Sequence, residues 1–101
     1  MILKEKMDYI VKIRKSLHMN DSYGIYKCWE EMTKLLSENE NDTTNYLIHC
    51  NSDDLNFVRE VFDDVSGNLK SDEFIKCLRS LDIKYPELEM TIDIDTAETY
   101  Y

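Results

Sequence analysis

The sequence predicts an all-α protein, an irregular bundle of five to six short antiparallel helices in a single domain at residues 1–101. Apolar residues recur at steps of three and four along most of the chain, which is the period of an amphipathic helix. The chain contains two glycines and one proline, whereas sandwiches and barrels need many turn residues. Its length of 101 residues fits one domain with a core of its own.

The first two helices are expected at residues 3–17 and 22–38. The first has one apolar face, formed by Leu3, Met7, Ile10, Ile13 and Leu17. The second has an apolar stripe formed by Ile25, Cys28, Trp29, Met32, Leu35 and Leu36. Trp29 lies at the centre of this stripe and is expected to be a core residue. Residues 19–22 break the pattern and include side chains that cap helix N-termini.

A third and a fourth helix are expected after a polar, acidic surface loop at residues 38–42. Thr43 or Thr44 is expected to cap the third helix, and Ser52 the fourth. The fourth helix is expected to end at residues 66–68, because glycine and asparagine favour the left-handed conformation that terminates helices.

The last part of the chain predicts two more helices. Ser71 is expected to cap the fifth helix, and Pro86 limits it, because a proline disfavours helical geometry in the residue before it. The segment from about residue 91 places Met90, Ile94, Ala97 and Tyr101 on one face and is expected to form a short helix packed on the bundle.

The net charge of −9 and the pI near 4.6 bear on possible partners. Nucleic acid and anionic membranes would repel this charge, whereas a basic protein would be attracted to it. Residues 1–18 contain five basic and two acidic side chains, and this basic segment is expected to lie across the acidic remainder. We find no secretory segment and no run approaching about 20 apolar residues, so a cytoplasmic location is expected.

The residues that carry out chemistry are sparse. Three widely spaced cysteines without a CxxC pair, and two histidines, argue against a metal site and favour reduced thiols in apolar surroundings. We identify no catalytic nucleophile with a base, no cofactor motif and no site for a small-molecule substrate. Residues 62–73 partly match a calcium-binding loop, but Phe62 occupies the first ligand position; a degenerate calcium sensor is a third hypothesis.

The acidic residues divide by their expected positions on the helices. Some follow a capping residue, where the helix dipole stabilises them and no function is needed to explain them: Asp53, Asp54, Asp72 and Glu73. Others are expected at or after a helix C-terminus, where the dipole opposes a negative charge: Glu38, Glu40, Asp63 and Asp64. The alternative explanation of these four residues is that solvated helix ends tolerate any polar side chain, so that no function is needed to explain them. The predicted partner-binding residues are Glu38, Glu40, Glu60, Asp63, Asp64 and, as an aromatic anchor, Tyr26.

Residues 43–101, rather more than half the chain, resemble the small helical immunity proteins of bacterial contact-dependent growth inhibition and related polymorphic toxin systems. The resemblance rests on Asn45-Tyr46-Leu47, Glu60-Val61-Phe62-Asp63-Asp64-Val65, Ser71, Glu73-Phe74-Ile75, Leu78, Lys84-Tyr85-Pro86-Glu87-Leu88, Asp93-Ile94, Ala97 and Tyr100. It implies a cytosolic protein made beside a toxin and neutralising it by tight binding. Many such toxins are basic nucleases, which suits the charge of −9.

Two functions remain open besides the calcium sensor. The first is an immunity protein without enzymatic activity, which covers the active or nucleic-acid-binding surface of a cognate toxin, expected to be a basic nuclease domain. The second is a helical regulatory or adaptor module that binds a peptide or protein subunit in an apolar groove. The first predicts salt-sensitive association, and the second predicts an exposed apolar patch and weak salt dependence.

Overall fold

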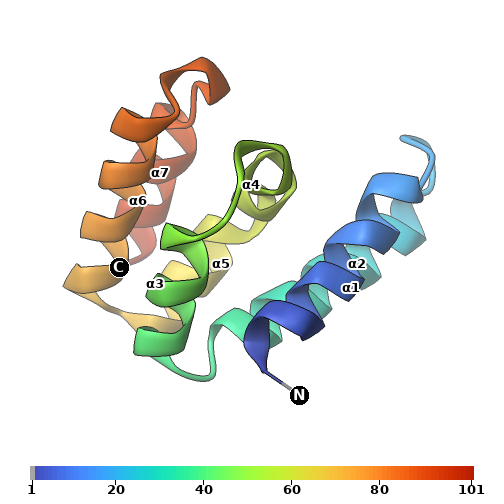
Figure 1. Ribbon diagram of the computed structural model, residues 1–101, viewed down its shortest axis with the longest axis horizontal. Coiled ribbons are helices and arrows are strands. Elements are labelled where there is room, and N and C mark those ends of the chain that lie inside the picture. The colour runs from blue at the N-terminus through green and yellow to red at the C-terminus, as the bar shows by residue number, and fades with distance from the viewer. Residues whose placement is uncertain (1) are drawn as a thin grey trace.

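The N-terminal part of the molecule is a pair of antiparallel helices, as predicted. The structure, a computed structural model that describes residues 2–101, has α1 at Leu3–Ser16 and α2 at Ser22–Leu36. The N-cap of α2 is Asp21, whose Oδ1 accepts a hydrogen bond from the backbone N–H of Gly24 at 2.9 Å. The two helices form one edge of the molecule (Figure 1).

The middle of the chain differs from the prediction in four places. The first is the predicted Ser52 cap of the fourth helix: the N-cap is Asn51, whose Oδ1 accepts a hydrogen bond from the backbone N–H of Asp54 at 2.8 Å. The helix α3 covers Glu40–Ile48 and is capped by Asn39, so the predicted loop at residues 38–42 and the predicted Thr43 or Thr44 cap are wrong. The predicted fourth helix is divided into α4 (Ser52–Val58), a 3-10 turn η1 (Arg59–Val61) and α5 (Phe62–Leu69). The predicted end at residues 66–68 is also wrong, because the left-handed residue is Lys70, with a φ of 48°.

Tertiary contacts explain the division of the fourth helix, since the segment contains no proline and no glycine before residue 67. The Arg59 guanidinium donates a hydrogen bond to Asp93 Oδ2 at 2.7 Å and another to the Glu89 carbonyl at 3.0 Å. These bonds attach η1 to the first turn of the last helix, which contains Asp93, and to the connection before it, which contains Glu89. Ser66 is buried in α5, where its hydroxyl donates to the Ala97 carbonyl at 2.6 Å. The chain therefore bends where partners outside the helix hold it.

The C-terminal part matches the prediction closely. The helix α6 covers Asp72–Lys84, a 3-10 turn η2 covers Pro86–Leu88, and α7 covers Thr91–Tyr100. Ser71 Oγ accepts the backbone N–H of Phe74 at 3.0 Å, which confirms the predicted cap of α6. Figure 1 places α6 and α7 at the edge opposite α1 and α2, with α3, α4 and α5 between them. The predicted all-α bundle is confirmed for the residues that the structure describes.

One apolar core joins all seven α-helices. Phe62 and Phe74 meet near its centre, edge to face, with their ring centroids 6.5 Å apart. The three cysteines are buried and free of disulfides, as expected for small apolar side chains. Other fully buried side chains include Met7, Met32, Leu36, Leu47, Leu55, Val58, Leu78, Met90 and Ile94.

The basic helix α1 does lie across the acidic body. Arg14 forms an ion pair with Glu60 at 2.8 Å, and Lys15 pairs with Asp53 at 2.7 Å and with Asp54 at 2.6 Å. Asp53 and Asp54 also occupy the first turn of α4, as predicted. Among residues 2–101, the helices are too short or too polar for any of them to cross a bilayer.

Candidate functional site

Four of the six predicted partner-binding residues gather around the contact between α2 and α5. Tyr26 on α2 and Asp64 on α5 line a shallow depression of about 360 Å3. We call it the α2–α5 depression; its lining residues are Tyr26, Trp29, Glu30, Thr33, Lys34, Asp64 and Asn68. Glu60 and Asp63 line a smaller hollow beside η1. The two hollows adjoin, because Trp29 of the first is hydrogen-bonded to Glu60 of the second.

Helical periodicity brings these side chains to one surface. Tyr26, Trp29 and Thr33 are separated by three and four residues, so they project from the same side of α2. Asp64 and Asn68 are four residues apart on α5 and face them across the helix contact. At one end the Asn68 amide donates to the Ser37 hydroxyl at 3.0 Å, which ties the end of α5 to the end of α2.

Trp29 is not the core residue that the sequence predicts, because 37% of it is exposed. The buried residues of α2 are Cys28, Met32 and Leu36, and Trp29 follows Cys28 after a turn of about 100° around the helix. Its indole N–H therefore reaches the border of the core and donates to Glu60 Oε1 at 3.0 Å. The structure adds Trp29 to the candidate site, and its spacing of three residues from Tyr26 is the signal in the sequence.

Glu60 is held by side chains of this chain. Its two carboxylate oxygens accept hydrogen bonds from Nε and Nη2 of Arg14, each at 2.8 Å. The Arg14 guanidinium carbon lies 5.2 Å from the centroid of the Phe57 ring. The Arg14 side chain is 14% exposed and that of Glu60 is 26% exposed, so the pair is largely shielded from solvent. Arg14 thus neutralises the charge of Glu60, and Glu60 fixes the orientation of the Trp29 ring.

Asp63 and Asp64 lie in the first turn of α5, so their expected position at a helix C-terminus is wrong. The dipole of α5 favours their charges there. None of the ion pairs in residues 2–101 includes either carboxylate. Partial burial, and then the charge of Asp63, raise the pKa of Asp64. An approaching cation would offset both effects by attracting the ionised carboxylates, so this pair is suited to binding positive charge.

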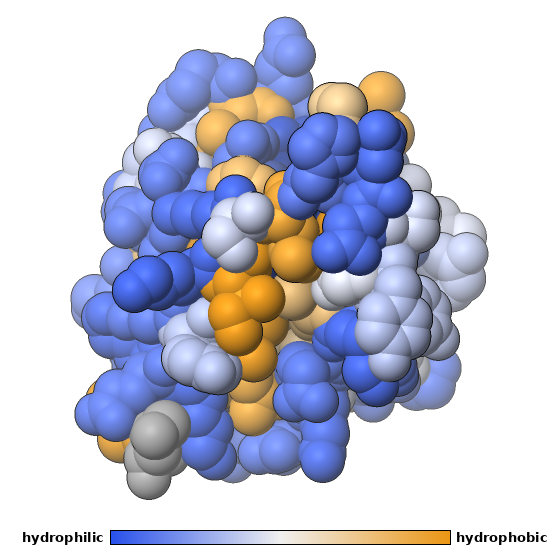
Figure 2. All heavy atoms as spheres, turned by 90° about the vertical axis from the view of Figure 1, so that its right-hand side faces the viewer, coloured by the Kyte–Doolittle hydropathy of each residue, from blue (hydrophilic) through white to orange (hydrophobic). Residues whose placement is uncertain are grey.

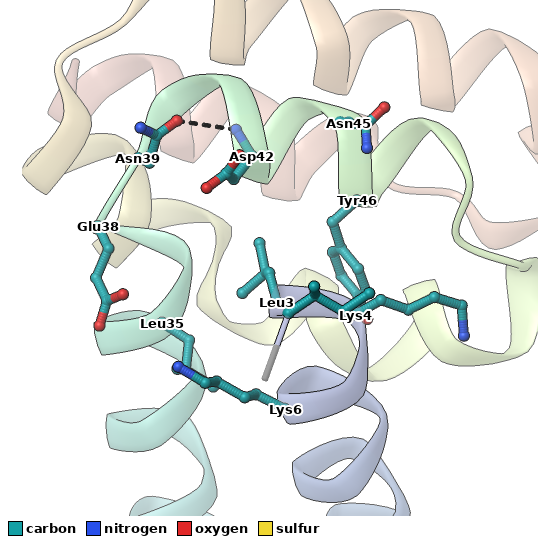
Figure 3. A pocket seen from close by; sticks show the side chains of 10 residues that line it. Leu3, Lys4, Lys6, Leu35, Glu38, Asn39, Asp42, Asn45 and Tyr46 are labelled. Atoms are coloured by element: carbon teal, nitrogen blue, oxygen red, sulfur yellow. Dashed lines mark hydrogen bonds between the residues drawn. The ribbon is translucent and has the colours of Figure 1, made fainter.

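Glu38 and Glu40 lie apart from these four residues. Glu38 follows the end of α2, as predicted, and lines a groove of about 580 Å3 between α1, α2 and α3. Figure 3 shows Lys6 extending from α1 towards Leu35 and Glu38, while Lys4 extends in the opposite direction past Tyr46, and Asp42 lies on α3. Both signs of charge border the groove, so it offers no uniformly negative surface.

Glu40 is in the first turn of α3, so its expected position after a helix C-terminus is also wrong. Its carboxylate accepts a hydrogen bond from the Ser71 hydroxyl, which connects the start of α3 to the cap of α6. Ser71 is buried and Glu40 is half-buried. The position of Glu40 is thus explained by a contact within the fold.

The backbone of residues 62–73 differs from that of a calcium-binding loop. Residues 62–69 form the helix α5, so the carboxylates of this segment do not surround a loop. Across residues 2–101, no group of three or more histidine, cysteine, aspartate or glutamate side chains is placed to hold a metal ion. Burial raises the pKa of the Cys50 and Cys77 thiols to about 11, so both are protonated at neutral pH.

No protein-family model, curated protein or solved structure matches this chain.

Proposed function

We propose that this protein is an immunity protein that binds a cognate toxin domain, a basic nuclease, and covers its active or nucleic-acid-binding surface. One observation supports this proposal above the others: the carboxylate of Asp64 lines the same depression as the exposed rings of Tyr26 and Trp29, and that of Asp63 lines the adjoining hollow. Neither carboxylate forms an ion pair within residues 2–101. Aromatic anchors next to charged groups are common at the centres of protein–protein interfaces.

Inhibition by this protein requires binding only. A nuclease attracts the phosphate backbone through a surface of lysine and arginine, and a protein of charge −9 is attracted to the same surface. Electrostatic attraction raises the rate of association, and aromatic contacts slow dissociation once the surfaces meet. The nucleic acid is then excluded from the site that the immunity protein occupies. The proposal implies a cytoplasmic location, where the toxin would meet cellular nucleic acid.

The candidate residues have different roles in this proposal. Asp63 and Asp64 are the charge contacts, and Tyr26, with 58% of its surface exposed, is the aromatic anchor. Glu60 acts through Trp29, whose ring it positions. The roles predicted for Glu38 and Glu40 stay predictions, because both lie away from the α2–α5 depression.

The proposal is tested by co-expressing the protein with the product of the adjacent upstream gene. We expect the two proteins to co-purify and the toxicity of the partner to be relieved. The double variant Asp63→Asn/Asp64→Asn should weaken both effects. The matched control is Glu87→Gln, which removes an exposed carboxylate that forms no ion pair within residues 2–101. Equal protection by the double variant and the wild type would contradict the proposed binding surface.

The alternative function, an adaptor that binds a peptide or subunit, is favoured by one specific observation. Figure 2 looks onto the side formed by α1 and α2 and shows a strip of apolar side chains with hydrophilic ones on both sides. A groove here is lined by Tyr9, Ile10 and Leu35, with charged residues at its edges. An adaptor using this groove would lose its partner on Tyr9→Glu and keep it after Asp64→Asn. Binding of a hydrophobic dye to the native protein would also favour it.

A further inference from the structure

The contacts of Arg14 show how this fold holds an arginine side chain between an aromatic ring and a carboxylate. Arg14 lies against the Phe57 ring at 5.2 Å and forms two parallel hydrogen bonds with the Glu60 carboxylate, each 2.8 Å long. A guanidinium is planar, so it can stack on an aromatic ring while its N–H groups face both oxygens of a carboxylate. The combination of ring and carboxylate therefore binds cations in this fold: Lys15 lies 5.9 Å from the same ring and pairs with Asp53 and Asp54. Arg14 differs from Lys15 in forming two parallel bonds with a single carboxylate.

The α2–α5 depression presents the same combination to the outside. Tyr26 and Trp29 supply the rings, and Asp64 supplies a carboxylate that forms no ion pair within residues 2–101. The volume of about 360 Å3 is near the lower end of the range of about 300–1,000 Å3 for ligand pockets. That size is sufficient for the guanidinium group and the methylene chain of one arginine.

The ring of Trp29 is positioned before any ligand arrives. Its indole N–H is bonded to Glu60, which Arg14 in turn holds through two hydrogen bonds. A ring fixed in this way loses little conformational freedom on binding, which favours affinity. Asn68, bonded to Ser37, limits the movement of the opposite end of the depression.

We propose that the α2–α5 depression is an arginine slot, in which a guanidinium from a partner protein stacks on Tyr26 and Trp29 and pairs with the Asp64 carboxylate. The slot deepens the proposed function, because it rests on the same surface and names the side chain that the toxin domain inserts. Arginine is preferred over lysine, since an ammonium group is compact, strongly hydrated and unable to form the two parallel bonds.

Lys34 gives the slot a built-in competitor. It lines the same depression, is exposed, and forms no ion pair within residues 2–101. Its ammonium repels an incoming guanidinium and lowers the negative potential around Asp64. Removing this charge by Lys34→Gln should therefore tighten the binding of arginine severalfold.

The slot can be tested with purified protein and short peptides. Trp29 is the single tryptophan of the chain, so its fluorescence and its indole N–H resonance report on the depression directly. The probes are N-acetylated, C-amidated tetra-arginine and tetra-lysine of equal charge. We expect tetra-arginine to shift the Trp29 signals in a saturable way and to bind at least fivefold more tightly than tetra-lysine. Asp64→Asn should weaken tetra-arginine about tenfold, and Glu87→Gln should leave it unchanged.

The slot is overturned if the two peptides bind equally, or if Asp64→Asn and Glu87→Gln have the same effect. Asp64 is exposed, so its amide variant is expected to fold, and circular dichroism checks this. Failure of the slot is distinguishable from failure of the proposed function. If the toxin binds Asp64→Asn as tightly as the wild type, the slot is contradicted and the immunity function still stands. If the protein binds tetra-arginine selectively but forms no complex with a toxin, the slot stands and the immunity function is contradicted.

Discussion

Two places in the molecule combine aromatic rings with a carboxylate, and they differ in where the cation comes from. At the junction of α1 and η1, Arg14 joins Phe57 and Glu60, and all three belong to this chain. In the α2–α5 depression, Asp64 lies beside Tyr26 without a cation partner among residues 2–101. Aromatic and carboxylate side chains thus stabilise the fold at the junction of α1 and η1, whereas in the α2–α5 depression they are available to a partner.

The comparison predicts that the internal carboxylate matters most for stability. Glu60→Ala leaves the largely buried Arg14 unpaired and removes the acceptor of the Trp29 N–H. We expect the free energy of unfolding to fall by about 2–4 kcal/mol. Urea denaturation followed by circular dichroism measures it. Asp64→Asn serves as the contrast and should change stability by no more than about 0.5 kcal/mol. Similar losses in both variants would remove the distinction between the two sites.

The reverse order is expected for binding. Asp64→Asn removes the charge that would face the proposed partner, so the affinity for the proposed basic toxin domain should fall about tenfold, which corresponds to about 1.4 kcal/mol. Surface plasmon resonance at two salt concentrations measures both rate constants. The wild-type association rate should decrease as salt rises, because screening weakens the attraction. An association rate independent of salt would contradict an electrostatic contribution.

The geometry of the internal site can be separated from its charge. Arg14→Lys keeps the positive charge but loses the paired hydrogen bonds and the stacking on Phe57. We expect a loss of about 1 kcal/mol in the free energy of unfolding, smaller than that of Glu60→Ala. If Arg14→Lys were as stable as the wild type, charge alone would account for the stabilisation at the junction of α1 and η1. The Arg14 site would then no longer support a preference for arginine in the α2–α5 depression.

The smallest effect is expected from pH. Burial and the neighbouring Asp63 raise the pKa of Asp64, so this carboxylate takes up a proton at a higher pH than an ordinary aspartate. Protonation removes the charge that attracts the partner, and binding therefore weakens as the pH falls through that raised pKa. Titration of affinity between pH 6 and about pH 4 should show this onset in the wild type. The onset should be absent in Asp64→Asn if Asp64 is its source.

Local rules predicted most of the helices correctly. The period of three and four residues places α1, α2, α6 and α7 close to their observed bounds, and Ser71 caps α6 as expected. The division at residues 59–61 was not predictable in this way, because the apolar pattern continues through it. The cause is Arg59, whose partners lie about 30 residues further along the chain. The N-terminus of α3 was missed because Asn39 caps it within a segment that has the composition of a loop.

The candidate site shows the same limit. Tyr26 and Asp64 were identified from residue type and from an expected helix end, and the position expected for Asp64 was wrong. Trp29 belongs to an apolar stripe, which predicts a core position, but α2 packs with Cys28, Met32 and Leu36 facing inward and leaves Trp29 at the border, where it bonds to Glu60. Glu40 and Glu60 have partners that are far away in the sequence.

The amino-acid sequence by itself determined the helical class of this protein, because apolar period and capping act between residues a few positions apart. It also determined the excess of negative charge, which is a property of composition. Only the tertiary structure decided which carboxylates are paired and which remain available, because Arg14, Lys15, Arg59 and Arg79 reach their partners across the fold. An ion pair depends on distance in space, and the order of residues in the chain does not record that distance.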